Sequence, residues 1–208
     1  MKLTGFDISP ESQLCLRGRI VLLRQLVDND YEAWRTVRMR CRDWLVPWEP
    51  RPSGAIVPPD DWHNYRARLL TRQRESQQGT GYGFGIFLED YFIGEITISS
   101  IQRGPFQSGY IGYWVDREFA GRGMAPEATC VAIQFAFEVL GLHRIEIAIV
   151  PRNLASRRVA EKLMLRNEGT AVRFLEINGV WEDHVRYAIT AEEWAYLKQS
   201  MSQWFPDQ

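Results

Sequence analysis

The sequence predicts a mixed α+β domain in which helices flank a mostly antiparallel sheet of seven strands. Runs rich in β-branched and aromatic residues fall into two groups, at residues 82–115 and 171–189. Between these groups a helix-like, a strand-like and a second helix-like pattern follow one another, an order that makes two neighbouring strands parallel. The chain has 208 residues, 45% of them hydrophobic, which suits one domain with a sizeable core.

The N-terminal part predicts one strand and two helices. Residues 19–26 (RIVLLRQL) resemble a strand, and residues 28–45 carry apolar side chains at helical spacing behind Asp28 or Asp30 as a cap. The five prolines of residues 46–59 predict a loop. A second helix runs from about residue 59 to residue 77, and its arginines are most simply a solvated face: Arg66, Arg68, Arg72 and Arg74.

The middle of the chain predicts a three-stranded meander. Residues 82–88 and 91–101 are strand-like runs separated by Glu89-Asp90, a candidate two-residue hairpin turn. Residues 109–115 (GYIGYWV) extend the meander after a loop that contains glycine and proline.

The C-terminal part predicts a helix, a strand, a helix, a hairpin and a last helix. Asn178-Gly179 is the strongest short-range hairpin signal in the chain, and Thr190 is the expected cap of the last helix. The connection between the two parallel strands should be right-handed. These elements cover residues 125–141, 144–150, 153–165, 171–177, 180–189 and about 190–201.

Composition limits the classes of function. We expect one domain over residues 1–208, with residues 1–17 as an N-terminal extension and residues 190–208 as a C-terminal helix and tail. The net charge of −1 gives the chain no overall attraction to nucleic acid or to an anionic membrane. Three widely separated cysteines support neither a disulfide framework nor a zinc site, so no metal is expected. No segment approaches the roughly 18 apolar residues of a membrane span, which predicts a cytoplasmic protein.

Two glycines stand between a strand and a helix in residues 113–127 (YWVDREFAGRGMAPE). Gly121 and Gly123 permit positive φ angles, and the helix that follows presents unpaired N–H groups to an anion. On spacing alone, a phosphate site and a simple tight turn are equally open. Asn153 and Ser156 open the next helix at the same end of the parallel strands, so we expect them to face one cleft with the turn.

The turn and the helix after it resemble two motifs of the GNAT superfamily of acyl-CoA-dependent N-acetyltransferases. Residues 120–128 (AGRGMAPEA) are similar to its pyrophosphate loop, and residues 153–165 (NLASRRVAEKLML) to its following block. The branch of ribosomal-protein-alanine N-acetyltransferases is nearer still, and the resemblance covers about residues 16–189. The similar segments are residues 42–50, 91–101, 110–116, 143–153 and 177–189.

The resemblance implies a single GNAT-like domain that binds acetyl-CoA. Two departures are Ala120, where the family usually has Gln or Arg, and residues 163–165 (LML), where it usually has Leu-Gly-Phe. The backbone of the strand before the turn would pair with the pantetheine, and the amides of the turn would hold the diphosphate. Arg157 or Arg158 would meet the adenosine phosphate, unless these arginines are a solvated helix face. The residues so assigned are Trp114, Val115, Ala120, Gly121, Arg122, Gly123, Met124, Ala125, Asn153, Arg157 and Arg158.

The resemblance also implies direct attack of an amine on the thioester, without an acyl-enzyme. Ser156 would donate to the leaving sulfur and Asn153 would fix the loop, although Ser156 could also be only a helix cap. An α-amine, with a pKa of about 7.7 to 8.0, needs only modest help to lose its proton. Glu95 is the first candidate base, unless it is an exposed strand residue, and Glu49 and His184 follow.

The acceptor is the least constrained part of the hypothesis. Trp48, Glu49, Tyr113 and His184 are its expected contacts, while Tyr113 could instead be core and His184 a structural histidine supported by a neighbouring aspartate. We expect acetyl transfer to the N-terminal α-amine of a ribosomal or other protein, by a monomer or homodimer. Acetylation of a small amine, such as an antibiotic or polyamine, and a catalytically inactive CoA-binding module are the alternatives.

Overall fold

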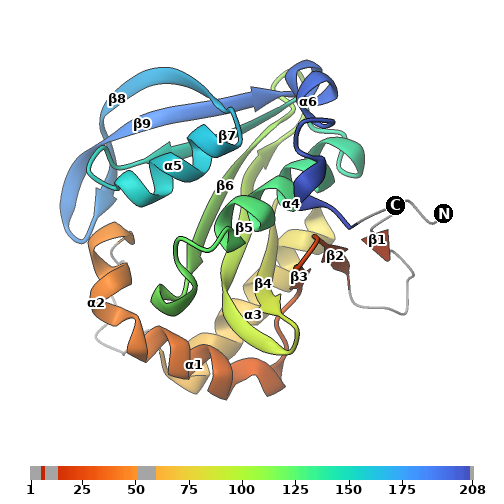
Figure 1. The fold of residues 1–208 in the computed structure, drawn as a ribbon. Coiled ribbons are helices and arrows are strands. Elements are labelled where there is room, and N and C mark those ends of the chain that lie inside the picture. Colours follow the sequence, from red (N-terminus) through yellow and green to blue (C-terminus); the bar gives the residue numbers. More distant parts are fainter. Residues whose placement is uncertain (1–5, 8–13, 51–59, 207–208) are drawn as a thin grey trace.

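A computed structural model describes residues 6–7, 14–50 and 60–206 of the chain. Its strands form one sheet in the order β1-β2-β3-β4-β5-β6-β7-β9-β8 (Figure 1). The strands are β1 (Phe6–Asp7), β2 (Cys15–Arg17), β3 (Val21–Arg24), β4 (Tyr82–Leu88), β5 (Tyr91–Gln102), β6 (Ser108–Val115), β7 (Arg144–Ile149), β8 (Arg166–Ile177) and β9 (Val180–Thr190). The α-helices are α1 (Tyr31–Arg40), α2 (Arg42–Leu45), α3 (Trp62–Gln78), α4 (Met124–Glu138), α5 (Leu154–Lys162) and α6 (Ala191–Leu197). Short 3-10 turns are η1 (Asp28–Asp30), η2 (Val46–Trp48), η3 (Arg117–Phe119) and η4 (Ser202–Trp204).

The predicted fold class is confirmed. All seven predicted strands are present, and among the described strands β6 and β7 form the one parallel pair, inside an otherwise antiparallel sheet. The described sheet has two more strands, β1 and β2, in the segment that was expected to be an extension. They are two and three residues long, too short to show a period-two pattern in the sequence.

Local turn chemistry predicted three boundaries correctly. Leu88 pairs with Tyr91 across Glu89-Asp90. Asn178 and Gly179 have φ angles of 45° and 84°, as a two-residue hairpin turn requires. Thr190 caps α6 and forms a capping box with Glu193.

Two other boundaries differ from the prediction. Helix α3 begins later than expected, because the Asp61 carboxylate accepts the N–H of Asn64 at 2.7 Å and fixes the N-terminus there. Asp30 does not cap α1 with its side chain but pairs with Arg24 at 2.7 Å. Within the predicted proline-rich loop, Val46–Trp48 form η2, and residues 51–59 lie outside the described residues.

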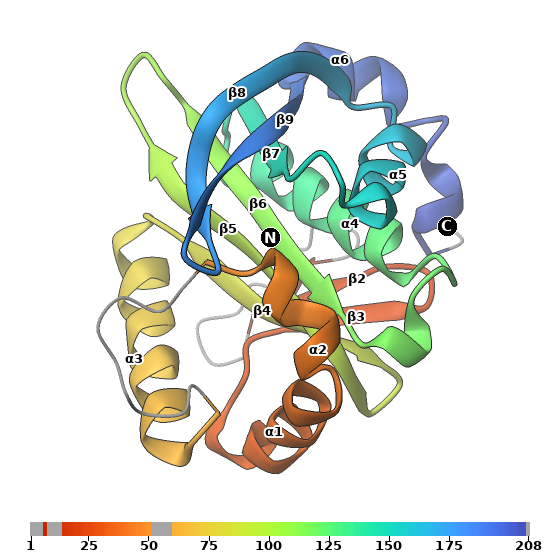
Figure 2. The ribbon, with the colours of Figure 1, turned by 90° about the vertical axis from the view of Figure 1, so that its left-hand side faces the viewer.

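Helices cover both faces of the sheet (Figure 2). Helix α4 is buried along most of its length in a large core that includes Ile96 and Ile98 of β5. Helices α1 and α3 cover the opposite face, where β5 presents Glu95 to Trp34 of α1. Because successive strand residues point to opposite faces, each strand of the meander serves both layers.

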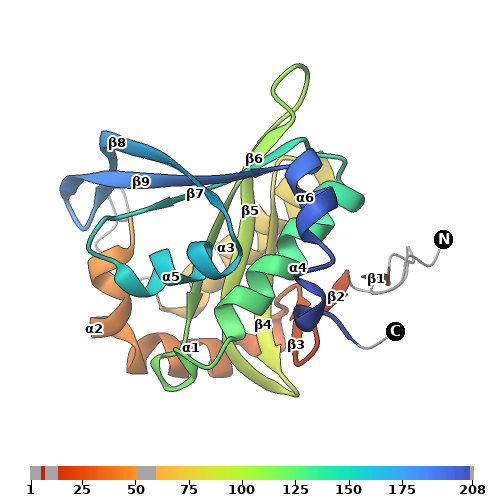
Figure 3. The ribbon, with the colours of Figure 1, turned by 45° about the horizontal axis from the view of Figure 1, so that its top comes forward.

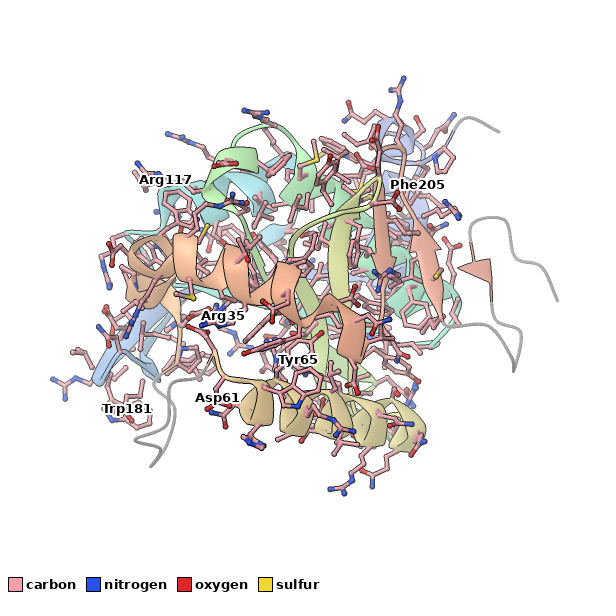
Figure 4. All side chains as sticks on the ribbon, turned by 90° about the horizontal axis from the view of Figure 1, so that it is seen from below. Arg35, Asp61, Tyr65, Arg117, Trp181 and Phe205 are labelled. Carbon is pink, nitrogen blue, oxygen red and sulfur yellow. The ribbon has the colours of Figure 1, made fainter. Side chains whose placement is uncertain are left out.

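A second, smaller core fills the space between α1 and α3. Tyr65 projects from α3 towards α1 (Figure 4), and its ring centroid lies 5.0 Å from that of Trp34 and 5.3 Å from that of Tyr31. Its hydroxyl donates to the carbonyl of Val27 at 2.7 Å. This aromatic cluster fixes α3 against α1, and therefore fixes the position of the arginines that α3 carries.

The parallel pair separates soon after it begins. The register of β6 and β7 pairs Ser108 with Arg144 and ends at Tyr110 with Glu146. Beyond that point β6 pairs only with β5, and β7 only with β9, in the described part of the chain. We call this divergence, between Ile111–Val115 of β6 and Ile147–Ile149 of β7, the fork. Helix α5 follows β7 and lies beside α4, which follows β6 (Figure 3).

Candidate functional site

The fork leaves one side of a strand backbone without a strand partner. Trp114 pairs with Glu95 of β5, and Val115 pairs with Gly94. On the other side, the described part of β7 provides no partner for either residue. Backbone N–H and C=O groups in that position can pair with an extended ligand.

The glycine turn follows the open end of β6. Gly121 has a φ of +78°, and a Cβ built there would meet no heavy atom within 4 Å. Gly123 has a φ of +93° and is the residue that precedes α4, whose N-terminus has no side-chain cap. The third residue of the helix is Pro126, which has no N–H. A Cβ at Gly123 would meet the Trp204 ring at 3.6 Å. The turn is therefore an uncapped helix N-terminus with open space at Gly121, a geometry that fits a diphosphate.

Glu127 holds this helix N-terminus in place from behind. Its Oε1 accepts the N–H of Ile20 at 2.6 Å and the N–H of Val21 at 2.9 Å. Burial raises the pKa of the Glu127 carboxyl, and these backbone hydrogen bonds partly oppose the increase. The carboxyl therefore joins α4 to the segment between β2 and β3.

The N-terminus of α5 meets β6 across the fork. The Oδ1 of Asn153 accepts the N–H of Ser156 at 3.1 Å, which caps the helix. The hydroxyl of Tyr113 lies 2.9 Å from the Ser156 Oγ and 3.2 Å from the Ser156 carbonyl oxygen. Burial raises the pKa of Tyr113, against a smaller opposing effect of the Ser156 hydrogen bond. The structure thus brings together three residues that the sequence analysis singled out.

Glu95 is buried rather than exposed on its strand, so that alternative is wrong. Only 5% of the residue is exposed, and its carboxylate is held by both terminal nitrogens of Arg68 and by the Trp34 Nε1 at 2.8 Å. Arg68 therefore does not belong to a solvated face. A cavity of about 560 Å³ lies beside this pair, lined among others by Arg66, Arg72 and Gln73 of α3.

The chain matches the family model described as "Acetyltransferase (GNAT) domain" over residues 21–166. The chain belongs to this family. It is 33% identical to the [ribosomal protein uS5]-alanine N-acetyltransferase of Escherichia coli, over 80% of this chain and 86% of that protein. The structure of Mycobacterium smegmatis RimJ in complex with CoA-disulfide is similar, with a TM-score of 0.84, 31% identity and coverage of 93% and 95% of the two chains.

A second solved relative agrees with this assignment. The ribosomal-protein-S5-alanine acetyltransferase of Vibrio fischeri superimposes with a TM-score of 0.77 at 32% identity, over 86% of this chain and 98% of that one. The chain is accordingly an acetyl-CoA-dependent N-acetyltransferase with a GNAT-like, coenzyme A-binding fold. No helix among the described residues is long and apolar enough to cross a membrane. The described residues contain no cluster of His, Cys, Asp and Glu side chains that could hold a metal ion.

The arginines near the fork differ in their freedom to bind a ligand. The Arg157 Nε donates to the Tyr187 hydroxyl at 3.2 Å, and one of its terminal nitrogens donates to the carbonyl of Pro151 at 3.3 Å. That hydrogen bond to Tyr187 raises the pKa of the guanidinium. Arg158 is exposed. Arg122 has its guanidinium 5.7 Å from the centroid of the Phe119 ring, next to the glycine turn.

The two departures from the GNAT motifs have different structural consequences. Ala120 is exposed at the end of η3, so it leaves the turn intact. Leu163 and Leu165 are buried in the main core, and Met164 between them adopts a φ of 53°. Met164 therefore occupies, at some conformational cost, the left-handed position that a glycine would take without strain.

The expected acceptor contacts are distributed over two regions. Glu49 is paired with Arg38, and the Arg152 guanidinium lies 5.2 Å from the Trp48 ring centroid. Of His184 only 2% is exposed, and its Nδ1 lies 3.0 Å from the carbonyl oxygen of Glu182. Asp183, the expected support of this histidine, instead accepts the N–H of Arg173 at 2.8 Å.

Sequence reasoning missed a buried charge cluster at the closed end of the fork. Glu146, paired in register with Tyr110, is bound by Arg144 and Arg186. Arg186 also approaches the Tyr110 hydroxyl at 3.4 Å and has its guanidinium 5.1 Å from the Phe174 ring centroid. In the sequence, Glu146 stands between two isoleucines of β7. This alternation does not show that two arginines converge on the carboxylate.

Proposed function

We propose that this chain transfers the acetyl group of acetyl-CoA to the N-terminal α-amine of a protein. The observation that carries the proposal is the fork, which has an uncapped helix N-terminus at its open end and the Asn153, Ser156 and Tyr113 cluster beside it. The relatives that are named for alanine N-acetylation of ribosomal proteins support this acceptor class. A ribosomal protein is therefore the first acceptor to test.

The donor half of the site would use mostly backbone groups. No described strand pairs with Trp114 and Val115 on the side away from β5, which leaves their backbone for the amides of the pantetheine. The turn at Gly121 and Gly123 offers N–H groups to the diphosphate. Arg122 and Arg158 are better placed than Arg157 to meet phosphates, because Arg157 is engaged with Tyr187. Met124 and Ala125 contribute first-turn amides, and Ala120 contributes no side-chain contact.

Acetyl-CoA would supply a thioester whose carbonyl carbon the neutral amine attacks. As the carbon–sulfur bond breaks, the electron pair passes to sulfur, and the amine loses one proton. We propose that Ser156 donates a hydrogen bond to the departing sulfur, while Asn153 holds the helix start that carries it. Both roles are compatible with capping.

Deprotonation of the amine requires little help near neutral pH, where an α-amine with a pKa of about 7.7 to 8.0 is partly neutral. We propose that Glu95 accepts this proton through water, since it lies on β5 next to Trp114. Its oxygens already accept hydrogen bonds from the Trp34 indole and from both terminal nitrogens of Arg68. Glu95→Gln should therefore reduce the rate by about tenfold, most at low pH, and an equal loss at every pH would remove Glu95 from this role.

The acceptor would approach from the side of η2 and the β8–β9 hairpin. Trp48 and Glu49 stand on that side, and Glu49 could attract a protonated amine even though it is paired with Arg38. His184 is buried, so we assign it a supporting position under the hairpin rather than a contact with the peptide. A backbone bridge between Pro50 and Ile177 joins the segment after η2 to the β8–β9 hairpin.

The decisive experiment measures thiol release from acetyl-CoA with different acceptors. The panel contains peptides with free N-termini, including those of ribosomal proteins, the same peptides with blocked N-termini, polyamines and aminoglycosides. We expect turnover only with free N-terminal peptides. Turnover with small amines alone would establish the small-molecule alternative, and silence with every amine despite coenzyme A binding would indicate an inactive binding module.

A further inference from the structure

We propose that Tyr113 is a positioning residue whose hydroxyl orients the Ser156 hydroxyl towards the leaving sulfur. This inference rests on the proposed function, and it reassigns Tyr113 from the acceptor side to the donor side. The evidence is the contact across the fork, where the Tyr113 hydroxyl lies 2.9 Å from the Ser156 Oγ.

The direction of the Tyr113 side chain follows from the alternation of β6. Trp114 belongs to the smaller core beneath α1 and α3, so Tyr113 points to the opposite face, where α5 begins. Its ring packs against the main core, and its hydroxyl reaches the first turn of α5. The hydroxyl of Tyr113 is therefore engaged with α5, on the face opposite Trp114.

The number of hydroxyl hydrogens allows one arrangement of Tyr113 and Ser156 in which the serine can donate to the sulfur. The Ser156 hydroxyl has a single hydrogen, and the Tyr113 hydroxyl can donate either to the Ser156 Oγ or to the Ser156 carbonyl oxygen at 3.2 Å. If Ser156 donated to Tyr113, no hydrogen would remain for the sulfur. When Tyr113 donates to the Oγ, the serine hydrogen is free, and the chain of two hydroxyls polarises it further.

The surroundings keep Tyr113 in the donor state. Burial raises the pKa of its phenol, so the hydroxyl remains protonated across the pH range in which an amine acceptor is assayed. The backbone of Ser156 is meanwhile fixed by the Asn153 cap at 3.1 Å. Asn153 thus sets where the serine lies, and Tyr113 sets where its hydrogen points.

The test compares Tyr113→Phe, Ser156→Ala and the double variant, with acetyl-CoA and an accepted peptide. We expect Tyr113→Phe to lower kcat by about tenfold and to leave the KM for both substrates within about twofold. Since Tyr113 acts through Ser156, the double variant should be no slower than Ser156→Ala alone. An unchanged kcat, an increase confined to the acceptor KM, or losses that multiply in the double variant would each overturn the proposal.

A second measurement requires no acceptor. The pKa of the thiol of enzyme-bound CoA, followed by the ultraviolet absorbance of the thiolate, should rise in Tyr113→Phe because the bound thiolate loses an oriented donor. An unchanged thiol pKa would contradict the inference even if wild-type protein acetylated no amine, an outcome that would refute only the proposed function. Tyr82→Phe removes a hydroxyl from a sheet tyrosine that packs on Phe135, and it should change neither quantity.

Discussion

Helices α4 and α6 begin in opposite ways. At α6, Thr190 accepts the N–H of Glu193 at 3.4 Å, and the Glu193 carboxylate accepts the N–H of Thr190 at 2.9 Å. At α4, Gly123 supplies no side chain, and the N-terminus has no side-chain cap among the described residues. At α6, side chains of the first turn accept backbone N–H groups. At α4, no described side chain caps the helix, and its first N–H groups are left for another acceptor.

The difference separates a helix start that its own side chains cap from one that we propose binds a diphosphate. A side-chain cap stabilises a helix by about 1 kcal/mol, so its absence at a fully packed helix such as α4 needs a reason. Helix α5 has a side-chain cap, Asn153, and Ser156 in the same turn also contacts Tyr113. The prediction with the largest expected effect places a charge at the uncapped start.

Gly121→Asp should weaken coenzyme A binding by about a hundredfold, because it places a carboxylate where the diphosphate is expected. A side chain fits sterically, since a Cβ at Gly121 meets nothing within 4 Å. Titration calorimetry with CoA measures the effect. The control is Gly121→Asn, which adds the same backbone strain at a φ of +78° without the charge. Equal losses of affinity in the two variants would show that strain, not charge, is responsible.

Glu127→Gln tests whether the buried carboxyl under α4 makes stability depend on pH. Burial raises the pKa of Glu127 in the folded state, so its contribution to the free energy of unfolding is fully present below the unfolded pKa and declines as pH rises through the folded pKa. The amide oxygen of Gln can still accept from Ile20 and Val21. We therefore expect the stability of wild type relative to the variant to fall as pH rises from about 4 to neutral.

Urea unfolding at several pH values measures this difference. The comparison variant is Glu193→Gln at α6, where the half-buried carboxyl pairs with Arg166 and accepts the N–H of Thr190. A wild-type advantage that grows with pH at position 127 would mean that the hydrogen bonds from the β2–β3 segment outweigh burial.

Thr190→Ala should lower the free energy of unfolding by about 1 kcal/mol and leave coenzyme A affinity unchanged. The loss comes from the broken capping box at α6, which lies at the end of β9. Chemical denaturation and calorimetry with CoA measure the two quantities. Weaker CoA binding in this variant would show that the two helix starts are coupled and not separate in function.

Local patterns predicted those parts of the fold that depend on neighbouring residues. Asn178-Gly179 fixed a hairpin, Thr190 fixed a helix start, and the spacing of Asn153 and Ser156 placed both beside the fork. Each depends on hydrogen bonds or φ angles within about four residues, which are encoded in the order of the chain.

Pairings between distant segments could not be predicted in the same way. Arg68 and Glu95 are 27 residues apart, and the sequence gives the charges without the aromatic packing that brings α3 over β5. The contact of Tyr113 with Ser156 was not predicted, because strand alternation alone does not say which face α5 will cover. Glu127 likewise bonds residues 106 and 107 positions away, which no local pattern encodes.

The smallest expected effect concerns a helix end rather than a helix start. Helix α3 is followed by Gly79, with a φ of 68°, whereas α5 is followed by Leu163 and then by Met164, with a φ of 53°. Met164→Gly should stabilise the fold by less than about 1 kcal/mol, because relief of left-handed strain is partly offset by greater freedom of the unfolded chain. Thermal and urea unfolding measure it, with Gly79→Ala as the reverse control, which should destabilise. A less stable Met164→Gly variant would mean that the half-exposed methionine side chain contributes more through packing than its backbone costs.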